Sequence, residues 1–363
     1  MAASEGACPC IEVLISKYDY SPNRWNVEHS ETPMHAAASE GQLAALKMLR
    51  DHGGDLDRGI QEGKSVLNLA VRSNQVKVVE YLLQSKVDVA GRGFAETALH
   101  VAAETNNEEC ARLLIEHGCP VGAARGEAQR ETALHAAATS EALATISLLL
   151  KHSADPNAKT ADGGVRPLHL ASKSHSIPCM KALIAAGGDI NAVDADGRPP
   201  LHYAVNSRHK EGCATIRFLS ESGADLNIRD SSGNTALHLA ASEPPGSMRH
   251  LNRVRTLILE GADLCLRNDA GQSALSRVLK RHPCCIKEIE ERFDSGVQVE
   301  WIPENGNGED EQGQGDVSYS DSVKVDFGIL LPTKCPTQKF DTEISEYSCN
   351  IKKQLKSSNF GHK

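Results

Sequence analysis

Six histidines recur along the chain at intervals of one or two repeating units, and such a regular set of imidazoles first raises the question of metal binding. They are His35, His100, His135, His169, His202 and His238. Successive packed helices lie about 10 Å apart, whereas the ligands of one zinc ion lie about 2 Å from it. The spacing therefore indicates no shared metal centre, and we expect neither a metal nor another cofactor.

Eleven cysteines are spread over 363 residues, which is too dilute for a disulfide scaffold. The close pairs in segments 8–10 and 284–285 lack a second Cys or His pair at zinc-finger spacing. Cys110, Cys179 and Cys213 fall in helical apolar patterns, which is typical of small core residues. We interpret the thiols as reduced and intracellular, and the sequence does not identify which of them, if any, is reactive.

The sequence contains no motif for a nucleophile elbow, a phosphate-binding glycine loop or a metalloprotease helix. With a net charge of −9, nucleic acid is not the expected partner. No apolar run approaches the about 18–20 residues that a membrane span needs. The sequence therefore predicts a non-enzymatic, cytoplasmic chain without a membrane span.

The elements that carry the histidines form a repeating unit, which is clearest between Asp194 and Asp230. The unit opens with a tight turn, Asp-x-x-Gly, at 194–197, and continues through an apolar pattern with helical spacing. It closes at Gly223, where a helix C-cap is expected, and the same order begins again at Asp230. Each unit therefore contains a turn, a short helix that follows a Thr-like N-cap, and a second helix.

Eight such units are predicted, and no unit can bury its apolar face without stacking on its neighbours. Their starts are Thr32, Ser65, Thr97, Thr132, Arg166, Pro199, Thr235 and Ser273. The second helices are predicted at Leu43–Arg50, Val76–Gln84, Glu108–Glu116, Leu143–Lys151, Cys179–Ala186, Thr215–Glu221 and Arg253–Glu260. Extra residues at 209–212 and 243–247 are expected to be loops. We assign residues 31–296 to the array and expect its last helical part to end near Phe293. We assign residues 1–30 to an N-terminal capping segment with one helix around 11–15.

The period and the starts Pro200-Leu201-His202 and Thr235-Ala236-Leu237-His238 resemble the ankyrin-repeat family. The resemblance implies an all-α fold: an ankyrin-repeat solenoid of about eight stacked helix-turn-helix units with β-turn fingers, followed by a flexible C-terminal tail. It also implies that the repeated histidines are structural and form hydrogen bonds between neighbouring turns.

Family geometry further implies a concave partner-binding strip, made of turn tips and the exposed side of each first helix. Transferred to this sequence, the strip consists of Phe94, Glu96, Glu104, Gln129, Glu131, Thr139, Lys173, Asp196, Arg198, Asn206, Ser231 and Asn234. The composition is mixed and mostly polar, which fits a protein partner better than a phosphate chain. For each residue alone, an ordinary solvated turn tip is the competing interpretation.

The repeat pattern stops after Gly296. Residues 297–322 are interpreted as an acidic disordered linker, because 303–322 is rich in Gly, Asn, Asp and Glu and contains no Lys or Arg. Residues 323–363 are interpreted as a short apolar segment, a strand or docking segment at 323–332, followed by a flexible tail.

The order of segments from Ser273 to Pro332 resembles the junction before the membrane region in invertebrate TRPA-type transient receptor potential cation channels, of the painless and pyrexia type. The resemblance implies a short or truncated form of the cytoplasmic part of a sensory channel subunit. Its partners would be full-length channel subunits at the inner face of the plasma membrane, and 323–332 would dock onto the helices near 273–297. The competing interpretation is an independent soluble ankyrin-repeat adaptor or scaffold in intracellular signalling.

Overall fold

The computed structural model describes residues 1–26, 31–57, 59, 65–89, 96–126, 130–206, 212–242, 248–281, 285, 299–302 and 322–325. It divides into two compact units, Met1–Glu211 and Gly212–Lys363, which we call unit 1 and unit 2. Each unit is built from short antiparallel helix pairs, so the predicted helical repeat architecture is observed in both.

Unit 1 begins with α1 (Cys8–Tyr18), which precedes five described helix pairs and one further first helix. The first helices of the repeats are α2 (Pro33–Ser39), α4 (Val66–Arg72), α6 (Ala98–Glu104), α8 (Ala133–Thr139), α10 (Pro167–Lys173) and α12 (Pro200–Asn206). The second helices are α3 (Leu43–Asp51), α5 (Val76–Gln84), α7 (Glu108–Glu116), α9 (Leu143–Lys151) and α11 (Ile177–Ala185). Strands β1 (Ala124–Arg125) and β2 (Glu131–Thr132) pair antiparallel within one finger, the turn that precedes α8.

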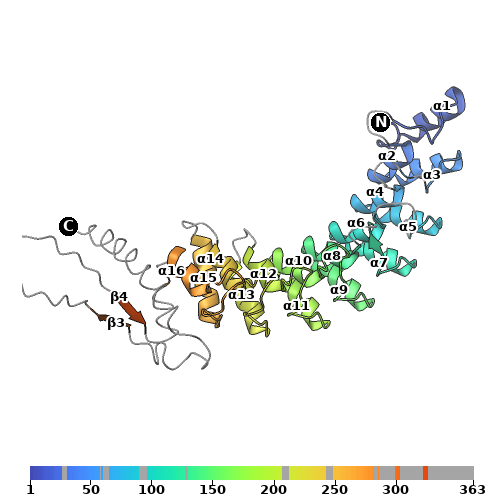
Figure 1. Ribbon diagram of the computed structural model, residues 1–363. Coiled ribbons are helices and arrows are strands. Elements are labelled where there is room, and N and C mark those ends of the chain that lie inside the picture. Colours follow the sequence, from blue (N-terminus) through green and yellow to red (C-terminus); the bar gives the residue numbers. More distant parts are fainter. Residues whose placement is uncertain are drawn as a thin grey trace, which may run out of the picture. The chain divides into compact units, whose positions relative to one another are not determined.

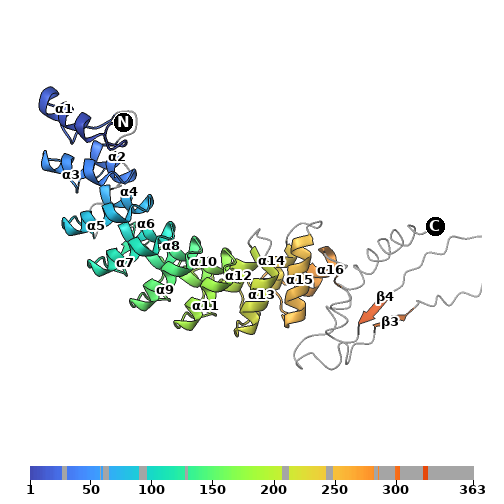
Figure 2. The ribbon, with the colours of Figure 1, turned by 180° about the vertical axis from the view of Figure 1, so that it is seen from behind.

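The helices of unit 1 form two rows (Figures 1 and 2). In one row α2, α4, α6, α8, α10 and α12 contact each other in chain order. In the other row α5, α7, α9 and α11 do the same, and α1 packs on α3. The first helices α2, α4, α6, α8 and α10 also contact their own second helices, so a first helix in the middle of the row is covered on three sides.

Small residues allow the first helices to lie close together. Alanine pairs such as Ala102–Ala103 in α6 and Ala137–Ala138 in α8 are completely buried. The second helices contribute one buried leucine each at the equivalent position: Leu49, Leu82, Leu114, Leu149 and Leu183. This leucine row is the centre of the core in unit 1.

Turn chemistry follows the sequence prediction closely. Gly197 has φ +74° and donates its N–H to the Asp194 carbonyl at 3.1 Å, which closes the predicted tight turn. Gly223 has φ +92° after its helix, the left-handed conformation expected of a C-cap glycine. Thr32, Thr97 and Thr132 are extended residues directly before their helices, as predicted for N-caps.

Three second helices begin earlier than predicted. Helix α11 starts at Ile177, two residues before the predicted Cys179, and Pro178 lies in its first turn, where no intrahelical donor is needed. In unit 2, α13 (Gly212–Glu221) includes Gly212, which was assigned to a loop, and α15 (Met248–Glu260) begins five residues before Arg253. The other predicted loop residues, 209–211 and 243–247, lie outside the described residues.

Unit 2 contains α13, α14 (Ala236–Ser242), α15 and α16 (Ala274–Arg281). Within it, α15 packs on both α13 and α14, and α14 packs on α16. The predicted helical end near Phe293 lies outside the described residues.

A short hairpin follows, in which β3 (Val299–Ile302) pairs antiparallel with β4 (Ser322–Val325). The strand β4 falls at the start of the predicted apolar segment. The strand β3 lies inside the range assigned to the acidic linker, where Val299, Trp301 and Ile302 supply the β-branched and aromatic residues that favour a strand. Residues 323–325 therefore pair with β3. Residues 326–332, the rest of the predicted docking segment, lie outside the described residues.

Candidate protein-interaction surface

All six repeated histidines are buried, and four of them connect successive repeats. The Nε2 atoms of His100, His135 and His169 lie 2.9–3.1 Å from the backbone carbonyl oxygens of Glu131, Val165 and Arg198. In unit 2, His238 Nε2 lies 3.0 Å from the Gln272 carbonyl oxygen. Each of these rings is therefore placed to tie one first helix to the following finger.

The hydrogen bonds at the other ring nitrogen fix the tautomer. Backbone N–H groups of Thr132 and Arg166 donate to Nδ1 of His135 and His169 at 3.2 and 3.1 Å. Because Nδ1 accepts, the proton must be on Nε2, which donates to the carbonyl of the next repeat. Burial lowers the pKa of His100 and of His169 to about 4, so both rings are neutral near pH 7.

The most extensive charged cluster among the described residues of unit 1 lies across the fingers that precede α6 and α8. Arg125 on β1 pairs with Glu104 at the end of α6 and, at 2.7 Å, with Glu131 on β2. Glu96 lies 3.6 Å from Arg125 Nη1 and 3.1 Å from Arg72 Nη2. Arg72 also approaches Glu104 at 3.6 Å. We call these five residues the finger network; three of them, Glu96, Glu104 and Glu131, belong to the predicted strip.

Apart from Arg72, whose side chain is 41% exposed, the finger network is half-buried. The carboxylate side chains retain 17–26 % exposure and that of Arg125 retains 25 %. Burial by itself would lower the pKa of Arg125, but the bonds to Glu104 and Glu131 outweigh it and raise that pKa. The network therefore holds its side chains in fixed positions while leaving part of each one accessible.

A second fixed cluster lies in the finger that precedes α12. The buried Asp194 carboxylate accepts from Tyr203 Oη at 2.7 Å and from Arg198 Nε at 2.9 Å. Burial would raise the pKa of Asp194, and these bonds outweigh it and lower that pKa. Arg198 also pairs with Asp196 at 2.7 Å and lies over the Tyr203 ring. The predicted strip residues Asp196 and Arg198 are thus both part of one braced turn.

The remaining strip residues of unit 1 are less constrained. Thr139, Lys173 and Asn206 are exposed at the last residues of α8, α10 and α12. Phe94 and Gln129 lie outside the described residues. Since α8, α10 and α12 are neighbours in the first row (Figure 1), these three exposed ends follow one another along unit 1.

Unit 2 contains the last two predicted strip residues, in the finger before α14. Ser231 is exposed. Asn234 is half-buried, and its Oδ1 accepts from Asn268 Nδ2 at 2.9 Å in the next finger. Asn234 therefore contributes to contacts between fingers.

Sequence reasoning missed both arginines of the finger network. Arg72 ends a first helix, and Arg125 lies seven residues before an N-cap, where family geometry alone marks neither. A usable signal was present: Glu96 and Glu131 each directly precede an N-cap in adjacent units, and Glu104 ends the first helix between them. Carboxylates that lie close together are stabilised by nearby cations.

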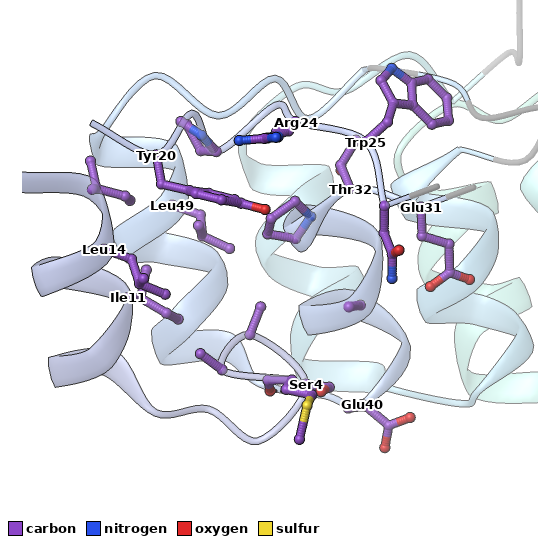
Figure 3. Close-up of a pocket in the computed structure, with 18 of the residues that line it drawn as sticks. Ser4, Ile11, Leu14, Tyr20, Arg24, Trp25, Glu31, Thr32, Glu40 and Leu49 are labelled. Carbon is purple, nitrogen blue, oxygen red and sulfur yellow. Dashed lines mark hydrogen bonds between the residues drawn. The ribbon is translucent and has the colours of Figure 1, made fainter. Parts of the chain in front are cut away.

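A groove occurs at the first end of unit 1, with a volume of about 900 Å³ (Figure 3). Ile11 and Leu14 from α1 and Leu49 from α3 line it, together with Tyr20 and Trp25 from the connection that follows α1. Arg24 lies 5.0 Å from the Tyr20 ring centre, and Figure 3 shows its guanidinium beside that ring. Most of the residues that line the groove belong to the predicted capping segment and to α2.

Among the residues that the structure describes, no group of three or more His, Cys, Asp or Glu side chains is arranged to hold a metal ion. Over the same residues, no helix is both long enough and apolar enough to cross a membrane.

Comparison with known proteins identifies the repeats. The family described as "Ankyrin repeats (3 copies)" matches residues 1–92, 87–160 and 168–268. Ankyrin repeat and SOCS box protein 5 of Oryctolagus cuniculus is 34% identical over 99 residues, which are 27% of this chain and 30% of that protein. Neurogenic locus notch homolog protein 1 of Cricetulus griseus is 36% identical over 89 residues, which are 24% of this chain and 4% of that protein.

The solved structure of the human ASB11 ankyrin repeat domain superposes with a TM-score of 0.55 and 24% identity, covering 64% of this chain and 99% of that chain. At this identity the likeness concerns the fold alone. This chain spans less than a third of the length of either curated relative named above, and neither of their names is that of an ion channel.

Proposed function

The chain belongs to the ankyrin-repeat family, and from this premise we propose that it is a non-enzymatic module that binds a protein partner through the fingers and first helices of unit 1. The binding surface comprises the finger network, the braced Asp196–Arg198 turn, and the exposed ends Thr139, Lys173 and Asn206.

The observation that carries this proposal is the finger network. Five charged side chains from three successive repeats are held by mutual ion pairs while remaining partly accessible. Side chains that are already ordered lose less conformational entropy when a partner binds. Fixed charges of both signs select a partner with complementary charges and set its register.

The proposal assigns no reaction to the chain. The six repeated histidines are at most 2% exposed, although imidazole is the side chain best suited to proton transfer near pH 7. Their ring nitrogens are committed to threonine hydroxyls and backbone groups in the repeats described above. A substrate would have no access to them.

The test uses exposed residues that the finger network does not need. T139R/K173E changes two neighbouring first-helix ends, and S147R/K77E places the same chemical changes on exposed positions of α9 and α5. Proteins captured from lysate of the source cells by the unaltered chain would be identified, purified and titrated against both variants. We expect T139R/K173E to weaken binding about tenfold or more and S147R/K77E to leave it unchanged. Equal binding by the two variants would contradict the proposal.

We further propose, as a finer assignment, that the chain is the cytoplasmic part or a short form of a TRPA-type channel subunit, acting at the inner face of the plasma membrane on full-length subunits. It rests on one observation, the resemblance of the order of segments from Ser273 to Pro332 to the junction before the membrane region in those channels. The alternative is an independent cytoplasmic adaptor.

Full-length transcript sequencing of the locus separates these two assignments. Transcripts in which the repeat exons are joined to several apolar runs of about 20 residues would support the channel assignment. If every transcript ends at Lys363, the channel assignment fails and the adaptor stands.

A further inference from the structure

We propose that the groove at the first end of unit 1 is a second protein-binding site, which accepts one helical turn of a partner with a leucine or methionine at its buried position. This site is separate from the fingers and goes beyond the function proposed above.

The backbone at the start of the chain reproduces the end of a first helix. Residues Glu5, Gly6 and Ala7 donate their N–H groups to the carbonyls of Met1, Ala3 and Ala2. Thirty-five residues later Glu40, Gly41 and Gln42 donate to Ala36, Ala38 and Ala37 in the same order. Gly6 and Gly41 both have positive φ, +69° and +74°. Residues 1–7 thus occupy the place of the last turn of a first helix.

The side chains at this junction repeat as well. Gln42 Nε2 donates to the Ser4 carbonyl at 3.3 Å, and Gln75 Nε2 donates to the Ser39 carbonyl at the same distance. The two junctions therefore share one geometry. In all the other repeats of unit 1, the first turn of the first helix occupies the position where this groove lies.

One leucine shows what that turn normally covers. Leu14 of α1 is equivalent to Leu49 of α3, but Leu14 is 39% exposed whereas Leu49 is 2% exposed. In the other repeats, the equivalent leucines are likewise buried, and so is the second residue of each first helix: Met34, Leu67, Leu99, Leu134 and Leu168. No apolar side chain equivalent to this second residue covers Leu14 in the groove.

The surrounding surface is the most apolar part of the described chain. Five of the eight exposed large hydrophobic residues belong to its first twenty residues: Met1, Val13, Leu14, Tyr18 and Tyr20. On the far wall, α2 presents Pro33, Ala36 and Ser39 to the groove, a row of small residues at helical spacing. Because α2 packs on α4 with its other side, a turn in the groove would continue the established row of first helices.

The probe is a synthetic peptide of this chain's own residues 129–135, acetylated and amidated, because it carries Leu134 at the required position after the N-cap Thr132. Binding is followed by the fluorescence of Trp25, which lines the groove, in a W301F background that leaves it the single tryptophan. We expect saturable binding with a Kd below about 1 mM. The same peptide carrying L134D should bind about tenfold or more weakly.

Matched protein variants locate the site. L14D places a charge in the groove, whereas V13D places the same charge on the neighbouring exposed residue of α1 that does not line it. We expect L14D to abolish peptide binding and V13D to retain it, with unchanged circular dichroism for both. A36W, which fills the groove from α2, should also abolish binding, and T139R/K173E should have no effect.

Three results would overturn the proposal: no saturable binding of the peptide, equal binding by L14D and V13D, or a concentration-dependent dimer that L14D abolishes and V13D does not. The last would make a second copy of this chain the occupant. If T139R/K173E loses the partner that binds the fingers but still binds the peptide, the groove is a site independent of the fingers.

Discussion

At the scale of single residues, the histidines link stability to pH. The pKa of His100 in the folded chain is lowered to about 4 by burial, from about 6.5 in an unfolded chain. The unfolded state therefore binds more protons between these two values, so stability is complete above pH 6.5 and is lost as the pH falls toward 4. Each unit of pKa difference corresponds to about 1.4 kcal/mol.

Asn68 of the same chain indicates which substitution would test this pH dependence. Asn68 stands where the other repeats of unit 1 have His, and its Nδ2 donates to the Glu96 carbonyl at 3.2 Å, as the histidines do to theirs. We expect H100N to cost about 1 kcal/mol at pH 7.5 and to reduce the loss of stability between pH 6.5 and pH 4. Urea unfolding at several pH values measures both; an unchanged pH slope would refute the titration account.

The finger network makes a prediction about its central cation. R125A would leave three half-buried carboxylates close together, and we expect a loss of about 1–2 kcal/mol after allowance for their exposure. Arg112 also pairs with two glutamates, Glu109 and Glu116, but on an exposed helix face. R112A should therefore cost clearly less stability than R125A. Equal losses in urea unfolding would mean that the network is no stronger than an ordinary surface pair.

At the scale of elements, close packing of the first helices depends on alanine. Ala137 of α8 is completely buried and α8 contacts both α6 and α10. A137L has no space for its added carbons, and we expect it to lower stability by about 1–3 kcal/mol. T139L, at the exposed end of the same helix, should change stability by less than about 0.5 kcal/mol. Thermal unfolding of both variants decides whether the row of first helices is as tightly packed as described.

The bounds of the helices were the feature that the sequence predicted best. The bounds Val76–Gln84, Glu108–Glu116 and Leu143–Lys151 were predicted correctly, because periodic apolar residues and turn signals coincide at both ends. The start of α11 was predicted two residues late; Pro178 lies in the first turn of this helix, where a proline is tolerated because its missing N–H would have no intrahelical partner. The sequence alone did not find the finger network either, since Arg72 and Arg125 are 53 residues apart and meet Glu96 and Glu104 only after the repeats stack.

At the scale of the whole molecule, the proposed function depends on two surfaces of unit 1. Unit 1 combines two features that differ in chemistry: charged, braced fingers along its first helices, and an apolar groove at its first end. In a stacked array each repeat contacts only its neighbours, so variants at one surface should leave the other intact.

The most direct test of the central claim is amide hydrogen exchange of the chain with and without its captured partner. The account predicts slower exchange in the fingers around Glu96 and Glu131 and at the ends of α8 and α10, near Thr139 and Lys173, with no change along α5, α7 and α9. Protection confined to those second helices, or no protection in unit 1, would contradict binding through the fingers and first helices.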